Sequence, residues 1–350
     1  MPVLTASRRD LAKGLALFGL AGAAPAVARA KPKPAADTVS LPAAEAAVKA
    51  AYERYRGLNE GKNADYIPAL AKVPSQLFGI ALVTPHGQVV AAGDVGHAFS
   101  IQSISKVFTL AQVLQESGEQ LVEDAVGVDA TGQAFNSIVA VEQHRGREMN
   151  PLVNPGAIAA TGLVKGDSAD AVWASISRMH DACAGRTLSV DAEVYRSESE
   201  TNQRNRAIAM LMSAYERFPG DPAQAVDLYT RGCSIAANAR DLAVMAATLA
   251  NGGRNPITRT QAIDNRHIPG LLAVMATAGL YDDSGKWLFR TGLPAKSGVG
   301  GGLIAVAPGR FGVAAFSPPL DAAGNSVRAQ KAIIDICRDL GANPYAVTPV

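Results

Sequence analysis

Ser103 and Lys106 stand three residues apart in the segment FSIQSISKVFTL, residues 99–110. Residues at this spacing share one face of a helix, so the serine hydroxyl and the lysine amine can meet there. A serine hydroxyl is a weak nucleophile until a base takes its proton, and a lysine enclosed by apolar groups can lose its own proton and act as that base. Apolar residues that could form the enclosure flank the pair, namely Ile101, Ile104, Val107, Phe108 and Leu110. The segment therefore predicts an activated serine at the first turn of a helix, where free backbone N–H groups can hold an oxyanion.

A second motif supports this interpretation, because S-x-x-K alone arises by chance in many chains. In LPAKSGVGGGLIAV, residues 293–306, Lys296-Ser297-Gly298 precedes a glycine run and an apolar strand. Enzymes with an S-x-x-K serine often carry K-[ST]-G on the edge strand that faces it. Glycine lets the backbone come close to a bound ligand, and an N–H of this strand can complete an oxyanion hole. The plain alternative is a glycine-rich bend before a strand, but the two motifs together favour a catalytic serine.

Composition and charge exclude some classes of function. The 350 residues carry 33 Lys and Arg against 31 Asp and Glu, a net charge of +2, without a basic stripe. This balance argues against nucleic acid as the main partner. Hydrophobic residues make up 48% of the chain, enough for a sizeable core.

No catalytic metal is expected, because no ligand spacing joins the histidines and no CxxC pair joins the cysteines. No cofactor is needed either, because lysine, serine and backbone dipoles supply the base, the nucleophile and the oxyanion site. The cysteines, odd in number, are expected in the core, and the sequence leaves open one disulfide among them in an oxidising compartment. These residues are His86, His97, His144, His180, His267, Cys183, Cys233 and Cys337.

The first 30 residues are typical of an export signal. Arg8 and Arg9 precede an apolar stretch at 14–27, and an Ala-Arg-Ala end at 28–30 resembles a cleavage site. The paired arginines resemble a twin-arginine signal, which carries folded proteins across a membrane. The apolar stretch is too short for stable membrane insertion, and residues 31–40 read as a solvated tether. We expect a periplasmic or secreted protein, or a cytoplasmic one if the signal is not used.

The apolar period predicts strands near both ends of the mature chain and helices between them. Residues 77–94 and 303–320 each read as strand, turn and strand. Helical spacing recurs at 41–57, 199–218, 222–233, 239–253 and 326–340. We therefore predict an α/β (α+β) fold in which both ends build one sheet and a helical part, roughly 120–250, is inserted. The site is expected in the crevice between the two parts.

Several longer motifs, in a fixed order, resemble the serine-dependent glutaminases. They are ADYIPALA, FSIQSISKVF, GQAFNSIVAVE, NPLVNPGAI, SESETNQRNRAIA, YTRGCSI, GLYDDSGKW and GLPAKSGVGGG, spread from about residue 52 to about residue 329. The resemblance implies a β-lactamase/transpeptidase-like fold, a mainly antiparallel sheet flanked by helices with an inserted all-helical domain. It also implies a single catalytic domain at 41–345 that hydrolyses L-glutamine to L-glutamate and ammonia through a Ser-Lys acyl-enzyme.

The resemblance implies the catalytic roles. Ser103 matches the nucleophile that attacks the side-chain amide, and Lys106 matches its general base. Tyr281, in GLYDDSG, matches a tyrosine that could pass the proton to the departing ammonia. The oxyanion would rest on the backbone N–H groups of Ser103 and Val299. Without the resemblance, Tyr281 reads as an ordinary half-buried tyrosine at a turn.

The resemblance also implies a pocket for one free amino acid. Glu198 matches the carboxylate that holds the α-ammonium, and Asn154 and Asn205 match neutral donors for the α-carboxylate and the amide. Tyr66 and Tyr229 match tyrosines that line the pocket. Without the resemblance, Glu198 and Asn205 would be judged exposed helix residues, although their spacing of seven places both on one helical face.

Two other functions stay open at this point. An exported β-lactamase or D-alanyl-D-alanine peptidase shares both lysine motifs but normally carries S-x-N or Y-x-N between them, and YTRGCS lacks that asparagine. A catalytically silent amino-acid-binding protein could share the fold, but the intact Ser103 and Lys106 argue against it. The loop GQAFNS departs from the usual family form at Ala134, and the export signal departs from commonly cytosolic relatives. A homodimer or homotetramer is expected from the resemblance only.

Overall fold

A five-stranded sheet forms the centre of the computed structural model, which describes residues 39–147, 149–217 and 220–347. The strand order is β2-β1-β8-β7-β6, and every neighbouring pair is antiparallel. The early strands are β1 (Gly79–Val83) and β2 (Val89–Gly93). The late strands are β6 (Ala295–Ser297), β7 (Gly302–Ala307) and β8 (Phe311–Phe316). The predicted fold, with one sheet built from both ends of the chain, is confirmed.

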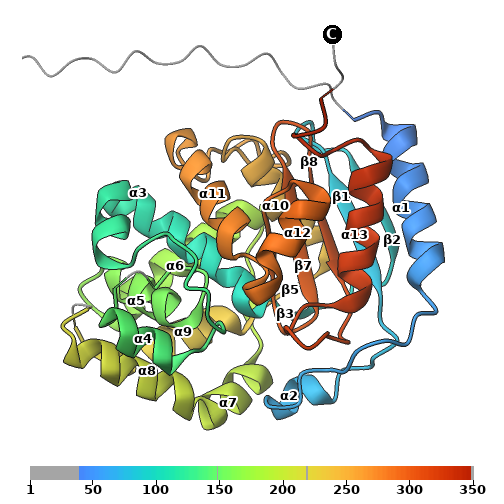
Figure 1. The fold of residues 1–350 in the computed structure, drawn as a ribbon. Coiled ribbons are helices and arrows are strands. Elements are labelled where there is room, and N and C mark those ends of the chain that lie inside the picture. Colours follow the sequence, from blue (N-terminus) through green and yellow to red (C-terminus); the bar gives the residue numbers. More distant parts are fainter. Residues whose placement is uncertain (1–38, 148, 218–219, 348–350) are drawn as a thin grey trace, which may run out of the picture. The chain divides into compact units, whose positions relative to one another are not determined.

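Helices cover both faces of this sheet (Figure 1). α1 (Leu41–Tyr55) and α13 (Val327–Asp339) pack against each other on one face, and α10 (Ala239–Ala250) crosses the other. Alternate residues of β1, β7 and β8 belong to two different apolar clusters, one for each face. Because both faces are covered, these strands are buried throughout, which explains their continuous apolar sequences.

Most of the other helices form the part inserted between the two halves of the sheet. They are α3 (Ser105–Ala125), α4 (Ile138–His144), α5 (Asn154–Leu163), α6 (Ala169–Ala184), α7 (Ala192–Thr201), α8 (Gln203–Ala214) and α9 (Pro222–Cys233). The short strands β3 (Phe99–Ser100), β5 (Ile235–Ala237) and β4 (Ser189–Val190) form a second sheet in that order. The remaining helices are α2 (Pro68–Ala71), α11 (Ile268–Ala278) and α12 (Ser284–Thr291).

One predicted helix is divided in two. The spacing of Glu198 and Asn205 predicted a shared helical face, but α7 ends at Thr201 and α8 begins at Gln203. Asn202 between them has φ −93° and ψ 23°, outside the helical range. The two residues therefore lie on different helices, and the expectation of one face was wrong.

The predicted export signal at 1–30 lies outside the described residues, as does almost all of the predicted tether at 31–40. Among the helices that the structure describes, none has the length and apolar character needed to cross a bilayer.

Candidate active site

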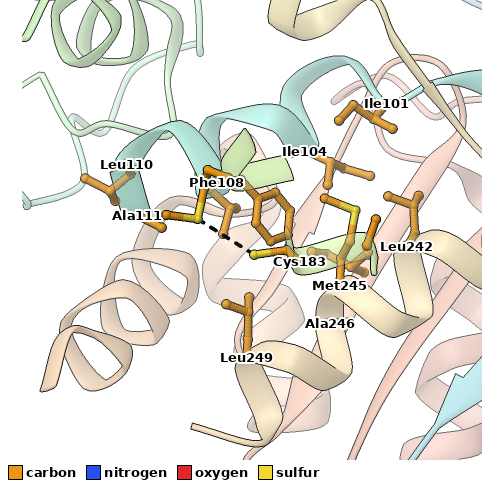
Figure 2. Close-up of a cluster of buried hydrophobic side chains, with 14 of the residues drawn as sticks. Ile101, Ile104, Phe108, Leu110, Ala111, Cys183, Leu242, Met245, Ala246 and Leu249 are labelled. Atoms are coloured by element: carbon orange, nitrogen blue, oxygen red, sulfur yellow. Dashed lines mark hydrogen bonds between the residues drawn. The ribbon is translucent and has the colours of Figure 1, made fainter. Parts of the chain in front are cut away.

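The turn that carries Ser103 is fixed by the core beneath it. Ser103 lies in a 3₁₀ helix, Gln102–Ile104, directly before α3, so the predicted helix begins with this tighter turn. Figure 2 shows side chains of this segment and of the first turns of α3 packed against side chains of α10. The five apolar residues expected to enclose Lys106 are all at most 1% exposed: Ile101, Ile104, Val107, Phe108 and Leu110.

Lys106 reaches the serine hydroxyl. Its Nζ lies 2.7 Å from Ser103 Oγ and 2.7 Å from Asn154 Oδ1, and its side chain is buried. Burial lowers the pKa of Lys106 to about 8, although the nearby Cys233 and Glu198 act in the opposite direction. A sizeable share of this amine is therefore neutral near pH 8, which is the form that can accept a proton.

Asn154, the first residue of α5, orients its neighbours. Its Oδ1 accepts from Lys106 and, at 3.2 Å, from the Tyr229 hydroxyl. Its Nδ2 donates to Asn205 Oδ1 at 3.0 Å. Because an amide has distinct donor and acceptor ends, these partners fix which end faces Lys106. The two asparagines that the sequence assigned to one pocket are thus in direct contact.

Glu198 is buried, and is not the exposed helix residue that it would be judged to be without the family resemblance. Gln102 Nε2 donates to Glu198 Oε2 at 3.2 Å. Burial raises the pKa of Glu198 to about 7, and the hydrogen bond from Gln102 and the charge of Lys106 only partly offset this. Among the residues that the structure describes, no arginine or lysine is bonded to this carboxylate, so it is suited to receive a cation from a ligand.

Gln102 is a site residue that the sequence analysis missed. Its φ of 50° is in the left-handed region, which costs energy for a residue other than glycine. Its Nε2 donates to Ser100 Oγ as well as to Glu198, both at 3.2 Å. The side chain thus ties the turn of the serine to the carboxylate on α7. The one sequence feature that could have indicated a role for Gln102 is its position directly before Ser103.

Tyr281 lies near Ser103 and has a strained backbone, with φ 54°. Its hydroxyl donates to the Ser297 carbonyl oxygen at 3.4 Å. Burial raises the pKa of Tyr281 to about 12, and hydrogen bonds with Ser103 and Ser297 lower it in part. Tyr281 therefore holds its proton at neutral pH within reach of the Ser103 hydroxyl.

Lys296 lies behind Tyr281 and is fully buried. Its Nζ donates to the carbonyl oxygens of Gly279 at 2.9 Å and Ser297 at 2.8 Å, and lies 4.3 Å from the Tyr281 ring centroid. Burial lowers the pKa of Lys296, and the charge of Lys106 lowers it further. Two carbonyl oxygens hold the amine against the face of the tyrosine ring, so Lys296 braces the tyrosine from behind.

The glycine run after Lys296 allows a close approach within the chain itself. A Cβ on Gly298 would lie 2.4 Å from the Ile101 carbonyl oxygen, and one on Gly300 would lie 2.4 Å from that of Ser100. We expected these glycines to admit a ligand. Their nearest neighbour is instead the backbone just before the serine, so they bring the turn that carries Val299 against the turn that carries Ser103.

These residues surround a cavity of about 260 Å³. Seven of the predicted site residues line it: Tyr66, Ser103, Asn154, Glu198, Asn205, Tyr229 and Val299. Gln102, Phe135 and Arg204 line it as well and were not predicted. Tyr66 is 54% exposed and stands at the rim. Lys106 and Tyr281 interact with Ser103, which lines the cavity.

No metal chemistry is indicated by the residues that the structure describes. Within residues 39–147, 149–217 and 220–347, no group of three His, Cys, Asp or Glu side chains could hold an ion. Cys183, Cys233 and Cys337 are buried free thiols.

A family model described as Glutaminase matches residues 61–345. The chain belongs to the glutaminase family. Glutaminases of Colwellia psychrerythraea and Brucella canis are 54% and 52% identical to it, covering 84% and 85% of this chain and 95% and 96% of their own. A solved structure of the probable glutaminase ybaS has a TM-score of 0.86 and 46% identity, covering 87% of this chain and 99% of that one. A structure of Mglu in its glutamate form has a TM-score of 0.80 and 34% identity, covering 85% and 69%.

Membership in the glutaminase family fixes the class of reaction and the fold. The chain is an amidohydrolase that acts in glutamine metabolism. Its fold is the β-lactamase-like fold of the structures that it matches, as the family resemblance implied.

Proposed function

We propose that the chain hydrolyses L-glutamine to L-glutamate and ammonia through a covalent acyl-enzyme on Ser103. The observation that carries the proposal is the 2.7 Å contact between Lys106 Nζ and Ser103 Oγ in a buried site where the pKa of the lysine is lowered to about 8. Neutral Lys106 takes the hydroxyl proton as the oxygen attacks the γ-carbonyl carbon. The backbone N–H groups of Ser103 and Val299 receive the developing oxyanion.

Proton delivery completes the first half of the reaction. Tyr281, within hydrogen-bonding reach of Ser103, gives its proton to the departing ammonia and regains one from Lys106. The C–N bond breaks and a glutamyl ester remains on Ser103. A water then adds to the ester, with Lys106 as base, and releases glutamate and the free serine.

The pocket also contains groups that suit the charged α-ammonium and α-carboxylate of a free amino acid. The buried carboxylate of Glu198 is complementary to an α-ammonium, and the amides of Asn154 and Asn205 can face an α-carboxylate. The structure of Mglu in its glutamate form, from a relative of this chain, supports the same ligand class.

Ser103→Ala tests the mechanism. It is expected to abolish ammonia release while glutamine binding, measured by calorimetry, persists. Mass spectrometry of rapidly quenched parent enzyme should find a glutamyl adduct on Ser103. Ser117→Ala, a serine on α3 outside the pocket, is the matched control and should keep normal turnover. Normal deamidation by Ser103→Ala would remove Ser103 as the nucleophile.

The alternative of a β-lactamase or D-alanyl-D-alanine peptidase gains no support from the comparisons, whose matches carry the name glutaminase. Assaying purified protein with glutamine and nitrocefin side by side separates the two. Ammonia release without nitrocefin turnover is the expected result.

We also propose that the leader at 1–30 directs export by the twin-arginine route. The paired Arg8 and Arg9, the apolar stretch and the Ala-Arg-Ala end support this proposal. Replacing both arginines by lysine should retain the protein in the cytoplasm in cell fractionation. Unchanged export of that variant would contradict the proposed route.

The family resemblance further supports a homodimer or homotetramer. Light scattering on the purified mature chain should give a mass of two or four subunits, and a monomer at working concentration would contradict it.

A further inference from the structure

A second cavity borders the candidate substrate pocket across the junction of α7 and α8. It measures about 400 Å³, and we call it the back cavity. Its lining residues are Ser199, Asn202, Arg206, Met210, Pro222, Ala223, Val226 and Asp227. Asn202 also lines the substrate pocket, so the two spaces share this lining residue.

The same two helices present different faces to the two cavities. Glu198 and Asn205 line the substrate pocket. Ser199 and Arg206, the next residue in each case, line the back cavity. Because neighbouring positions of a helix point about 100° apart, each helix can serve both spaces. The back cavity is therefore a separate space and not an extension of the active site.

Opposite charges stand at the rim of the back cavity without pairing. Arg206 Nη2 donates to the Ser199 carbonyl oxygen at 2.9 Å, and the Asp227 carboxylate accepts from the Tyr195 hydroxyl. Among the residues that the structure describes, no ion pair joins Arg206 to Asp227. Both side chains keep unused donors or acceptors, so a ligand that carries both charges can engage them together.

The wall and floor between these charges favour an apolar group. Met210, 61% exposed, lies with Pro222 and Val226 along the cavity. These three side chains make the lining between the two charges largely apolar, as in many small-molecule sites.

We propose that the back cavity binds an α-amino acid with a large apolar side chain. Its carboxylate would face Arg206, its ammonium would face Asp227, and its side chain would pack on Met210. The cavity of about 400 Å³ has room for such a side chain. The site is independent of the acyl-enzyme chemistry proposed above.

Calorimetric titration of the full chain with L-phenylalanine tests the proposal. Saturable binding is expected, and both N-acetyl-L-phenylalanine and L-phenylalanine methyl ester should bind at least about tenfold more weakly, because each lacks one charge. Arg206→Gln and Asp227→Asn should each weaken binding by about tenfold or more for the same reason. Both residues are exposed, so unchanged ammonia release from glutamine verifies that the variants are folded.

Two control variants make the outcome decisive. Arg240→Gln, an exposed arginine on α10 outside the cavity, should bind phenylalanine as the parent does. Glu198→Gln should also bind it normally, since Glu198 faces the other pocket. Loss of binding in Glu198→Gln with retention in Arg206→Gln would locate phenylalanine in the substrate pocket and overturn the proposal. The absence of saturable binding to the parent would overturn it as well.

Discussion

Replacing Glu198 by glutamine should make the chain more stable and less able to bind its substrate. Burial raises the pKa of Glu198 from 4.5 to about 7. Between these values the folded state holds a proton that the unfolded state releases, so the free energy of unfolding falls as pH rises through this window. At 1.36 kcal/mol for each pKa unit, the cost of ionising the folded state at pH 8 is about 3 kcal/mol. Glutamine avoids this cost and can still accept the hydrogen bond from Gln102.

Chemical denaturation at pH 5 and pH 8 measures the effect. Glu198→Gln should exceed the parent in free energy of unfolding by about 3 kcal/mol at pH 8 and by less than about 1 kcal/mol at pH 5. Taking the difference between variant and parent at each pH cancels the titration of other groups. Glu200→Gln, two residues further along α7 and exposed, should change stability by less than about 0.5 kcal/mol. A gain that is equal at both pH values, or a loss at pH 8, would refute the reasoning.

The same variant should lose activity. Removing one partner of a buried charge pair costs about 2–5 kcal/mol, so kcat/KM for glutamine should fall on the order of a hundredfold, mainly through KM. A kcat/KM within a factor of two of the parent would separate Glu198 from recognition of the α-ammonium.

Three further predictions address the machinery around the serine. Lys106 has a pKa lowered to about 8 and can accept a proton only as the neutral amine, so kcat/KM should rise as pH passes through 8, and a flat profile from pH 6 to 9 would contradict its proposed role as base. Gly300→Ala should lower the free energy of unfolding by about 1–3 kcal/mol, because the added Cβ would lie 2.4 Å from the Ser100 carbonyl oxygen. Gly96→Ala, which meets no atom within 4 Å, is the control for that denaturation experiment. Tyr281→Phe should reduce kcat by about a hundredfold or more with KM little changed, as expected for loss of a proton donor, and steady-state kinetics with a normal kcat would exclude that role.

Much of what could be predicted came from local sequence patterns. The strand pairs at 77–94 and 303–320 follow from continuous apolar runs interrupted by turn residues, and the sheet contains both. The contact between Ser103 and Lys106 follows from their spacing of three, which no distant part of the chain can alter. The pocket residues came from the longer family motifs, because no local rule joins segments a hundred residues apart.

The features that could not be predicted depend on tertiary contacts. The break between α7 and α8 falls at Asn202, whose Nδ2 donates to Thr230 Oγ1 on α9 at 3.2 Å, a partner invisible in the local sequence. The buried Glu198 accepts its hydrogen bond from Gln102, which is 96 positions away in the sequence. The glycine run after Lys296 likewise packs against the backbone just before Ser103, a contact that the local sequence does not indicate.

The pairing of β1 with β8 has a consequence for synthesis of the chain. The hairpin of β1 and β2 leaves the ribosome early. Its partner strand in the sheet, β8, ends at Phe316 and is synthesised much later. Pairing over such a separation is slow, because a long loop must close before any contact compensates for it. Until then, the nascent protein has an apolar strand edge without its partner, open to association with other chains. We expect these unfinished chains to need a chaperone during translation. A protein translated from a message truncated before β8 should have no activity.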